Sequence, residues 1–291
     1  MTPTTMTFTS EDDLDITAYE WTPNGAVRGI VQLTHGMGEH ALRYEPLATE
    51  LTARGFAVVA QDHRGHGATA GSVEQHGHLG RAGWPGLVRD IGRLGERARA
   101  DFPDVPLVLL GHSMGSFAAQ QYALDHSTDI DALALTGTAV LDLLEPQLKL
   151  DQPLDLAMFN SPFTPARTDY DWLSRDEAQV DLYVADPACG FGLDQEGTVQ
   201  MFECARPLAD PARVAAMRGD LPVWIAAGEH DPVHGQLTLL SPLIQRYTAQ
   251  LSDVTVHIYP GARHEVFNET NRDEVVTDLI TWLDRVVPPT S

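Results

Sequence analysis

The segment Gly111–Gly115 carries a serine, Ser113, with a glycine two residues to either side. The apolar run Val108–Leu110 precedes it, and a helical pattern begins at Phe117. A serine on a sharp turn from a strand to a helix is exposed at the edge of a sheet, and side chains at the two glycine positions would collide with neighbouring backbone. A Gly/Ser-rich turn without chemistry is the alternative, but the placement between strand and helix favours a serine nucleophile.

A serine nucleophile needs a base, and the base needs a carboxylate that orients it. His264 follows an apolar run that ends at Tyr259, and it is the best placed of the twelve histidines. We therefore predict that His264 is the general base. The alternative for any single loop histidine is a solvated side chain without a role.

The acid is expected just beyond the run Val223–Ala227, where three candidates stand in succession. These are Glu229, His230 and Asp231. Asp231 is favoured because Pro232 fixes the turn that follows it. The chain order is then Ser113, Asp231, His264.

Hydrolysis of an ester or amide also needs two N–H donors where the oxyanion develops. The residue after the nucleophile, Met114, can supply one backbone N–H. The loop His35–His40, with two glycines, can supply the other from Met37. We interpret the His35 side chain as a structural hydrogen-bonding group rather than a second base.

Short apolar runs alternate with segments of helical spacing, which is typical of a mostly parallel sheet with helices on both faces. The predicted strands are Gly29–Thr34, Phe56–Gln61, Pro106–Leu110, Ala132–Thr136, Pro222–Ala227 and Thr255–Tyr259, and Met6–Ser10 and Leu14–Trp21 form an antiparallel edge hairpin. The predicted helices are Tyr44–Arg54, Trp84–Phe102, Ser113–Asp125, Gln236–Gln250 and Arg272–Val287. The carboxyl ends of such strands would bring the candidate residues to one edge.

Residues 141–207 interrupt this alternation with apolar residues and prolines but no evident strand. A stretch of this length is too long for a simple loop, so we predict a partly helical cap inserted into a core made of residues 1–140 and 208–291. The leucines of the cap either pack it onto the core or also accept an acyl chain, and both interpretations stay open.

The composition excludes several classes of protein. The 291 residues carry 19 Lys and Arg against 41 Asp and Glu, a formal charge of −22, which disfavours binding to nucleic acid or anionic membranes. Apolar runs are too short to span a bilayer, and residues 1–10 lack the features of a secretory signal. Two cysteines, Cys189 and Cys204, indicate reduced thiols in a cytoplasmic protein, with a disulfide between them as the alternative.

Five motifs in order resemble the monoacylglycerol lipase and lysophospholipase-like group of α/β-hydrolases, also called serine aminopeptidase-like. They are His35–His40 with Arg43–Tyr44, Asp62–Gly67, Gly111–Gly115, Gly228–Val233 and Gly261–Glu265. The resemblance implies the α/β-hydrolase fold with a central sheet of about eight strands and a helical lid. It also implies a triad of Ser113, Asp231 and His264 and oxyanion amides from Met37 and Met114. Ser116 departs from the group, where a third glycine is frequent, and Asp171–Asp176 looks like the same stretch of bacterial members with unassigned substrates.

The leading hypothesis is a serine carboxylic-ester hydrolase that cleaves a monoacylglycerol or a similar amphipathic ester through an acyl-enzyme on Ser113. The alternatives are an amide or peptide hydrolase with the same triad, and a non-catalytic lipid-binding version of the fold. No dinucleotide motif is present, and the close pairs His63/His66 and His76/His78 lack partner ligands at metal-site spacing. We therefore expect no cofactor and no metal ion.

Overall fold

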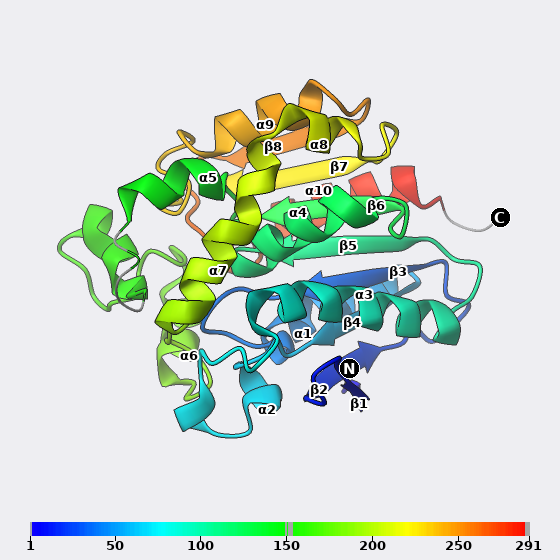
Figure 1. Ribbon diagram of the computed structural model, residues 1–291, viewed down its shortest axis with the longest axis horizontal. Coiled ribbons are helices and arrows are strands. Elements are labelled where there is room, and N and C mark those ends of the chain that lie inside the picture. The colour runs from blue at the N-terminus through cyan, green and yellow to red at the C-terminus, as the bar shows by residue number, and fades with distance from the viewer. Residues whose placement is uncertain (1, 149, 151–153, 289–291) are drawn as a thin grey trace.

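The protein is built on a single eight-stranded sheet in the order β1-β2-β4-β3-β5-β6-β7-β8 (Figure 1). The structure is a computed structural model and describes residues 2–148, 150 and 154–288. β1 pairs antiparallel with β2 and β2 antiparallel with β4, while all other neighbours are parallel. This arrangement confirms the mostly parallel α/β sheet and the edge hairpin that the sequence predicts.

The strands lie within one or two residues of their predicted ends. They are β1 Thr4–Thr9, β2 Asp15–Trp21, β3 Gly29–Thr34, β4 Phe56–Gln61, β5 Leu107–His112, β6 Ala132–Thr136, β7 Val223–Gly228 and β8 Val254–Tyr259. β5 runs two residues beyond the predicted end at Leu110, because Gly111 and His112 remain paired with β6. The strand therefore leads directly into Ser113.

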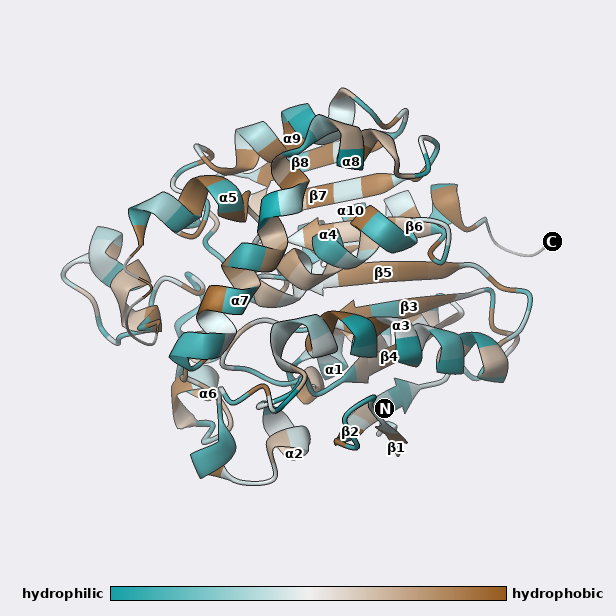
Figure 2. Ribbon diagram, in the orientation of Figure 1, coloured by the Kyte–Doolittle hydropathy of each residue, from teal (hydrophilic) through white to brown (hydrophobic). Residues whose placement is uncertain are grey.

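Helices cover both faces of the sheet, as alternation of side chains along the central strands requires. In β5, Leu107 and Leu109 join one apolar cluster, while Val108 and Leu110 join the other. The first cluster packs under α3 Gly83–Asp101, α4 Met114–His126 and α9 Leu240–Thr248, and the second under α1 Glu45–Ala53 and α10 Arg272–Val286. Figure 2 shows the hydrophobic strands β5 and β7 between helices with hydrophilic outer faces.

One predicted helix is wrong at its start. The pattern predicted a helix over Gln236–Gln250, but α9 begins only at Leu240. Gln236 and Leu237 have φ of 50° and 70°, which is left-handed backbone that an α-helix does not contain. The Leu237 N–H instead donates to Nδ1 of the buried His234 at 2.9 Å, which holds the turn.

Between β6 and β7 the described residues form short helices and no strand. These elements are α5 Leu141–Leu144, a 3₁₀ helix at Leu156–Phe163, α6 Glu177–Ala185, α7 Gln195–Ala205 and α8 Pro211–Ala215, with shorter 3₁₀ turns at Glu145–Gln147 and Arg206–Ala209. α7 packs across α3 and α4, as Figure 1 shows, and α5 and α6 lie beyond the carboxyl ends of the strands. Residues 149 and 151–153 of the predicted cap lie outside the described residues.

The remaining short elements are α2 Gly67–Ala70 and the 3₁₀ turns Ala41–Tyr44, Val73–Gln75 and Val266–Asn268. Within the described ranges, every helix is too short or too polar to cross a membrane.

Candidate active site

Ser113 sits at the turn between β5 and α4 in strained backbone, with φ of 51° and ψ of −123°. A non-glycine residue in this region carries strain that surrounding contacts must offset. The flanking glycines allow the turn: a Cβ on Gly115 would lie 2.2 Å from the carbonyl oxygen of Thr34, and one on Gly111 would lie 2.7 Å from Cα of Ser116. The turn is fixed further because Ser116 donates from Oγ to the Ser113 carbonyl at 2.6 Å. This turn holds the Ser113 side chain at the edge of the sheet, where a serine of a strand-to-helix turn is exposed.

His264 and Asp231 form a buried hydrogen-bonded pair. Nδ1 of His264 lies 2.9 Å from Oδ2 of Asp231, and both side chains are almost fully buried. Burial by itself lowers the pKa of an imidazole, but the Asp231 carboxylate outweighs it and raises the pKa of His264 above its ordinary value. Burial likewise works to raise the pKa of Asp231, and the adjacent His264 holds that pKa below the usual carboxyl range.

The two other candidates for the acid lie elsewhere. Glu229 is exposed and its Oε2 accepts a hydrogen bond from the Gly261 N–H at 2.9 Å. His230 is exposed as well. Of the three residues that the sequence left open, the structure brings only Asp231 to His264.

Aromatic rings enclose His264. The ring centroids of Trp172 and His264 lie 4.9 Å apart. The ring centroid of His112, the last residue of β5, lies 4.7 Å from that of His264. The backbone of the inserted segment also contacts this loop, since the Glu265 N–H donates to the Leu173 carbonyl at 2.8 Å. Burial lowers the pKa of His112 to about 4, so this second imidazole is neutral at physiological pH.

The loop after β3 passes directly over Ser113. A Cβ on Gly36 would lie 3.1 Å from Cβ of Ser113, so this backbone approaches the serine closely. Met37 and Met114 both line the pocket that contains Ser113. Within the part of the chain that the structure describes, neither the Met37 N–H nor the Met114 N–H is paired with a protein acceptor. Both amides are therefore available to a ligand.

A charged cluster beneath this loop ties it to the His264 loop. Arg43 donates to Oε2 of Glu39 at 2.5 Å and, with two nitrogens, to both carboxylate oxygens of Glu265 at 2.6 and 2.8 Å. Oε1 of Glu39 in turn accepts from the Gly36 N–H at 2.5 Å and from the Tyr44 hydroxyl at 2.7 Å. Burial works to raise the pKa of both carboxyls, but the Arg43 charge keeps them below the usual range and ionised.

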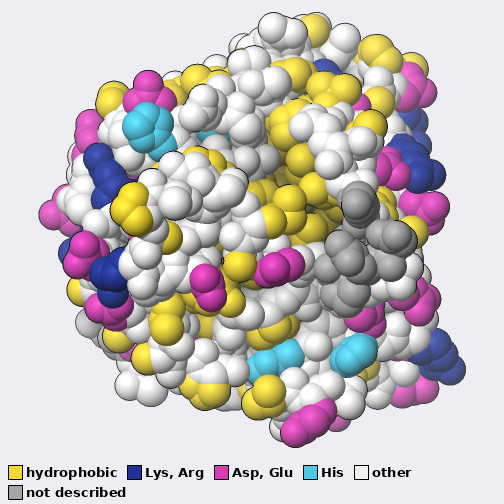
Figure 3. All heavy atoms as spheres, turned by 90° about the vertical axis from the view of Figure 1, so that its left-hand side faces the viewer, with side chains coloured by type: hydrophobic (Ala, Val, Ile, Leu, Met, Phe, Trp, Pro, Cys, Tyr) yellow, Lys and Arg dark blue, Asp and Glu magenta, His cyan; other side chains and the backbone are white. Residues whose placement is uncertain are grey.

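The pocket around Ser113 is lined mainly by apolar side chains, as small-molecule sites commonly are. Its polar lining includes Ser113, His264 and His112, and its two carboxylates, Glu39 and Glu265, are bound by Arg43. Figure 3 shows hydrophobic side chains gathered around a hollow on the face beyond the strand ends. The apolar lining from the inserted segment comprises Leu141, Leu144, Leu148, Leu154, Leu156, Phe159, Trp172, Leu173, Met201 and Phe202.

Other polar residues of the motifs hold loops together. Asp62 accepts hydrogen bonds from the backbone of Ala41 and Ala68, and the buried Arg64 binds Asp90 and Asp12. His35 is fully buried, accepts the His63 N–H at 3.0 Å, and has its pKa lowered to about 3 by burial. The buried His35 therefore serves to hold the loops together through its hydrogen bond to the His63 N–H.

Sequence reasoning gave no role to Glu39, Arg43, Glu265 or Trp172. All three stand in the motifs singled out above: Glu39 and Arg43 belong to the first motif, and Glu265 directly follows His264. The Arg43–Glu265 pair joins positions 222 residues apart, which no local pattern shows. Trp172 lies in the inserted segment, where regular spacing was absent.

Comparison with known proteins identifies the family. Residues 25–271 match the model of the serine aminopeptidase S33 family. The chain is 33% identical over 268 residues to the monoacylglycerol lipase of Mycolicibacterium smegmatis, covering 90% of each chain, and 30% identical to the mouse monoglyceride lipase, covering 90% of this chain and 84% of that one. It also resembles the solved structure of a thermostable carboxyl esterase from Bacillus coagulans in complex with glycerol, with a TM-score of 0.88, 27% identity and 99% coverage of both chains. These matches confirm the resemblance carried by the motifs, and the chain belongs to the serine aminopeptidase S33 family of α/β-hydrolases.

Proposed function

We propose that this protein is a serine hydrolase of carboxylic esters that cleaves monoacylglycerols or similar amphipathic monoesters through an acyl-enzyme on Ser113. The observation that carries the proposal is the joint placement of three features. Ser113 sits on a strained turn, it shares one pocket with a His264 that is paired to buried Asp231, and the rest of that pocket is mostly apolar. The names of the lipase and esterase relatives support the same class of substrate.

In the proposed reaction, His264 takes the proton of Ser113 as the hydroxyl attacks the ester carbonyl. Asp231 accepts from Nδ1 and so keeps the other ring nitrogen, Nε2, free to act as the base. The oxyanion is stabilised by the N–H groups of Met37 and Met114, with the positive end of α4 adding to the field. His264 then protonates the leaving alcohol, and water, activated by the same imidazole, releases the acid.

The inserted segment is proposed to be a cap that receives the acyl chain. Residues 141–207 supply most of the apolar lining around Ser113, and the core of residues 1–140 and 208–291 supplies the reacting groups. Burial of an alkyl chain against this lining would contribute about 25 cal/mol of binding free energy per Å² of apolar surface removed from water. Chain length should therefore affect binding strongly.

The charge of the pocket disfavours an aminopeptidase, the alternative with the same triad. Recognition of a free N-terminal ammonium needs an unpaired carboxylate, yet Glu39 and Glu265 are both engaged by Arg43. An ester with an uncharged acyl chain requires no such partner. A matched pair of substrates, an ester and its anilide, separates the two alternatives directly.

The test is hydrolysis of monoacylglycerols from butanoyl to octadecanoyl by the wild-type chain and Ser113→Ala. We expect an optimum at medium or long chains and a loss of about 10⁴-fold or more in the variant. Labelling of the wild type by a fluorophosphonate probe, absent in Ser113→Ala, would establish the nucleophile independently. Full activity in the variant would refute the mechanism, and turnover of only the shortest esters would refute the lipid substrate while leaving the nucleophile intact.

A further inference from the structure

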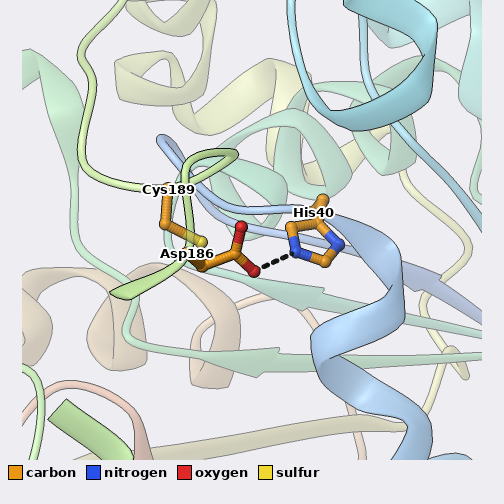
Figure 4. Close-up of side chains that lie close together, drawn as sticks. All are labelled: His40, Asp186 and Cys189. Atoms are coloured by element: carbon orange, nitrogen blue, oxygen red, sulfur yellow. Dashed lines mark hydrogen bonds and ion pairs between the residues drawn. The ribbon is translucent and has the colours of Figure 1, made fainter. Parts of the chain in front are cut away.

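A histidine, an aspartate and a cysteine converge beside the loop that covers Ser113. His40 precedes the 3₁₀ turn Ala41–Tyr44, and Asp186 and Cys189 follow α6. One ligand atom of each residue lies within 4.8 Å of the others, and Nε2 of His40 is 2.9 Å from Oδ2 of Asp186. Figure 4 shows the His40 ring and the Cys189 side chain on either side of the Asp186 carboxylate.

We propose that His40, Asp186 and Cys189 form a binding site for one thiophilic divalent cation, with Zn²⁺ as the preferred ion. Imidazole, carboxylate and thiolate are the three kinds of side chain that bind Zn²⁺, and the thiolate disfavours Mg²⁺ and Ca²⁺. Around a tetrahedral zinc the ligand atoms lie about 3.3–3.8 Å apart, given bonds of about 2.0–2.3 Å. Small side-chain movements would bring the three ligand atoms, which now lie within 4.8 Å of one another, to this spacing.

Binding of the ion exchanges a proton for the metal. The metal-free thiol carries its proton at neutral pH, as an ordinary cysteine does. The cation forms a bond to Sγ as that proton leaves to solvent, and it replaces the His40–Asp186 hydrogen bond with one bond to each side chain. The Nε2 proton of that hydrogen bond is transferred by solvent to Nδ1, so the imidazole stays neutral and Nε2 binds the ion. All three residues are partly exposed, so a water molecule can occupy the fourth position.

The charges around the cluster favour a cation. The Cys189 thiol is within electrostatic reach of the carboxylates of Asp186, Glu39 and Glu265, and of one guanidinium, that of Arg43. Arg43 is already paired with Glu39 and Glu265, so Asp186 is the carboxylate of this group that would bind the ion, and the whole chain carries a formal charge of −22. The sequence predicts no metal because His40 lies 146 positions before Asp186, and only the fold brings it to Asp186 and Cys189.

A bound ion would connect two segments that already touch. The Gly190 N–H donates to the Gly38 carbonyl at 3.0 Å, and the Tyr183 hydroxyl donates to the same oxygen at 2.8 Å. The cation would replace the His40–Asp186 hydrogen bond, which also joins these segments, with coordination bonds from the loop Gly36–His40 to Asp186 and Cys189. Because it binds only the folded arrangement, saturating Zn²⁺ should raise the melting temperature.

The test is titration of the reduced, EDTA-treated protein with Co²⁺, which reports a bound thiolate by a charge-transfer absorption band, followed by displacement with Zn²⁺. We expect one equivalent in the wild type and at least a tenfold weaker affinity, with no thiolate band, in Cys189→Ser. His40→Gln should also bind Co²⁺ at least tenfold more weakly. Two matched controls should bind Co²⁺ as tightly as the wild type does. Cys204→Ser removes the other cysteine. His78→Gln breaks the pair of His78 and Asp194, whose side chains are 2.8 Å apart with no cysteine beside them.

Melting curves with and without Zn²⁺ provide a second measurement. An upward shift is expected in the wild type and both controls, and none in Cys189→Ser, while all variants should melt cooperatively in EDTA. A wild type that binds no Co²⁺ would overturn the site, and so would equal binding by Cys189→Ser. Neither measurement involves an ester, so the outcome is independent of the proposed function.

Discussion

Arg43 and Glu265 stand 222 positions apart in the sequence and form a two-nitrogen, two-oxygen ion pair with distances of 2.6 and 2.8 Å. Glu265 directly follows the proposed base His264. The same guanidinium holds Glu39, which fixes the backbone of Gly36 above Ser113. One side chain thus sets the position of the loop Gly36–His40 relative to the proposed base.

Removal of this guanidinium should destabilise the fold severely. Arg43→Met leaves two buried carboxylates without their partner, and loss of one member of a buried pair costs about 3–5 kcal/mol. The free energy of unfolding from urea denaturation measures this cost. Arg54→Met removes an exposed arginine at the end of α1 and should change it by about 0.5 kcal/mol or less. Equal stability of the two variants would contradict the role given to Arg43.

Asp231→Asn should lower kcat/KM for ester hydrolysis by about 10⁴-fold, because an amide can donate to Nδ1 and stabilise the wrong imidazole tautomer. The matched change is Glu229→Gln, two residues earlier in the same turn. Its oxygen can still accept from the Gly261 N–H, so kcat/KM should stay within about twofold of the wild type, a change of less than about 0.5 kcal/mol. Similar losses of kcat/KM in both variants would contradict the assignment of Asp231 as the acid.

The pKa of His264 should be visible in a proton titration. Its pKa is raised by Asp231, so the neutral base is lost, and kcat/KM falls, as the pH drops through a value above the ordinary imidazole pKa of about 6.5. By linkage, the protonated ring stabilises the folded chain below the unfolded-state pKa, and this contribution is lost as the pH rises through the folded-state pKa.

NMR titration of the imidazole in Ser113→Ala measures this pKa without turnover. The added change Asp231→Asn should shift it downward, because burial then acts without the opposing carboxylate. Assignment of the resonance comes from His264→Gln. A pKa that is the same with and without Asp231 would show that the carboxylate does not set it.

Leu144→Trp should shorten the acyl chains that the pocket accepts. Leu144 lines the pocket, whereas its neighbour Leu143 does not line it and is 42% exposed. A tryptophan at 144 fills part of the lining, so kcat/KM for hexadecanoyl esters should fall at least tenfold while that for butanoyl esters changes little. Leu143→Trp should affect neither substrate, and an unchanged chain-length profile for Leu144→Trp would place the acyl chain elsewhere.

The sequence predicts the sheet well because its strands are buried on both faces and therefore appear as continuous apolar runs. The serine turn is equally visible, since the two glycines are required by contacts within a few residues and with the next strand. The start of α9 could not be predicted, because the helical pattern extends across Gln236 and Leu237 although His234 holds them in a turn. The Arg43 cluster and the contact of Trp172 with His264 depend on long-range packing, which local spacing does not encode.

The order of the elements places the inserted segment between the two halves of the proposed chemistry. Ser113 and both candidate oxyanion amides precede residue 141, and Asp231 and His264 follow residue 207. A protease cut within the segment would therefore yield one fragment with the nucleophile and another with the base and acid. Pairing of β6 with β7 and the Arg43–Glu265 ion pair would be among the contacts that keep the fragments together. In such a nicked chain, ester turnover would require both fragments and would therefore report on their association. The order of the elements along the chain thus divides the proposed triad between two fragments.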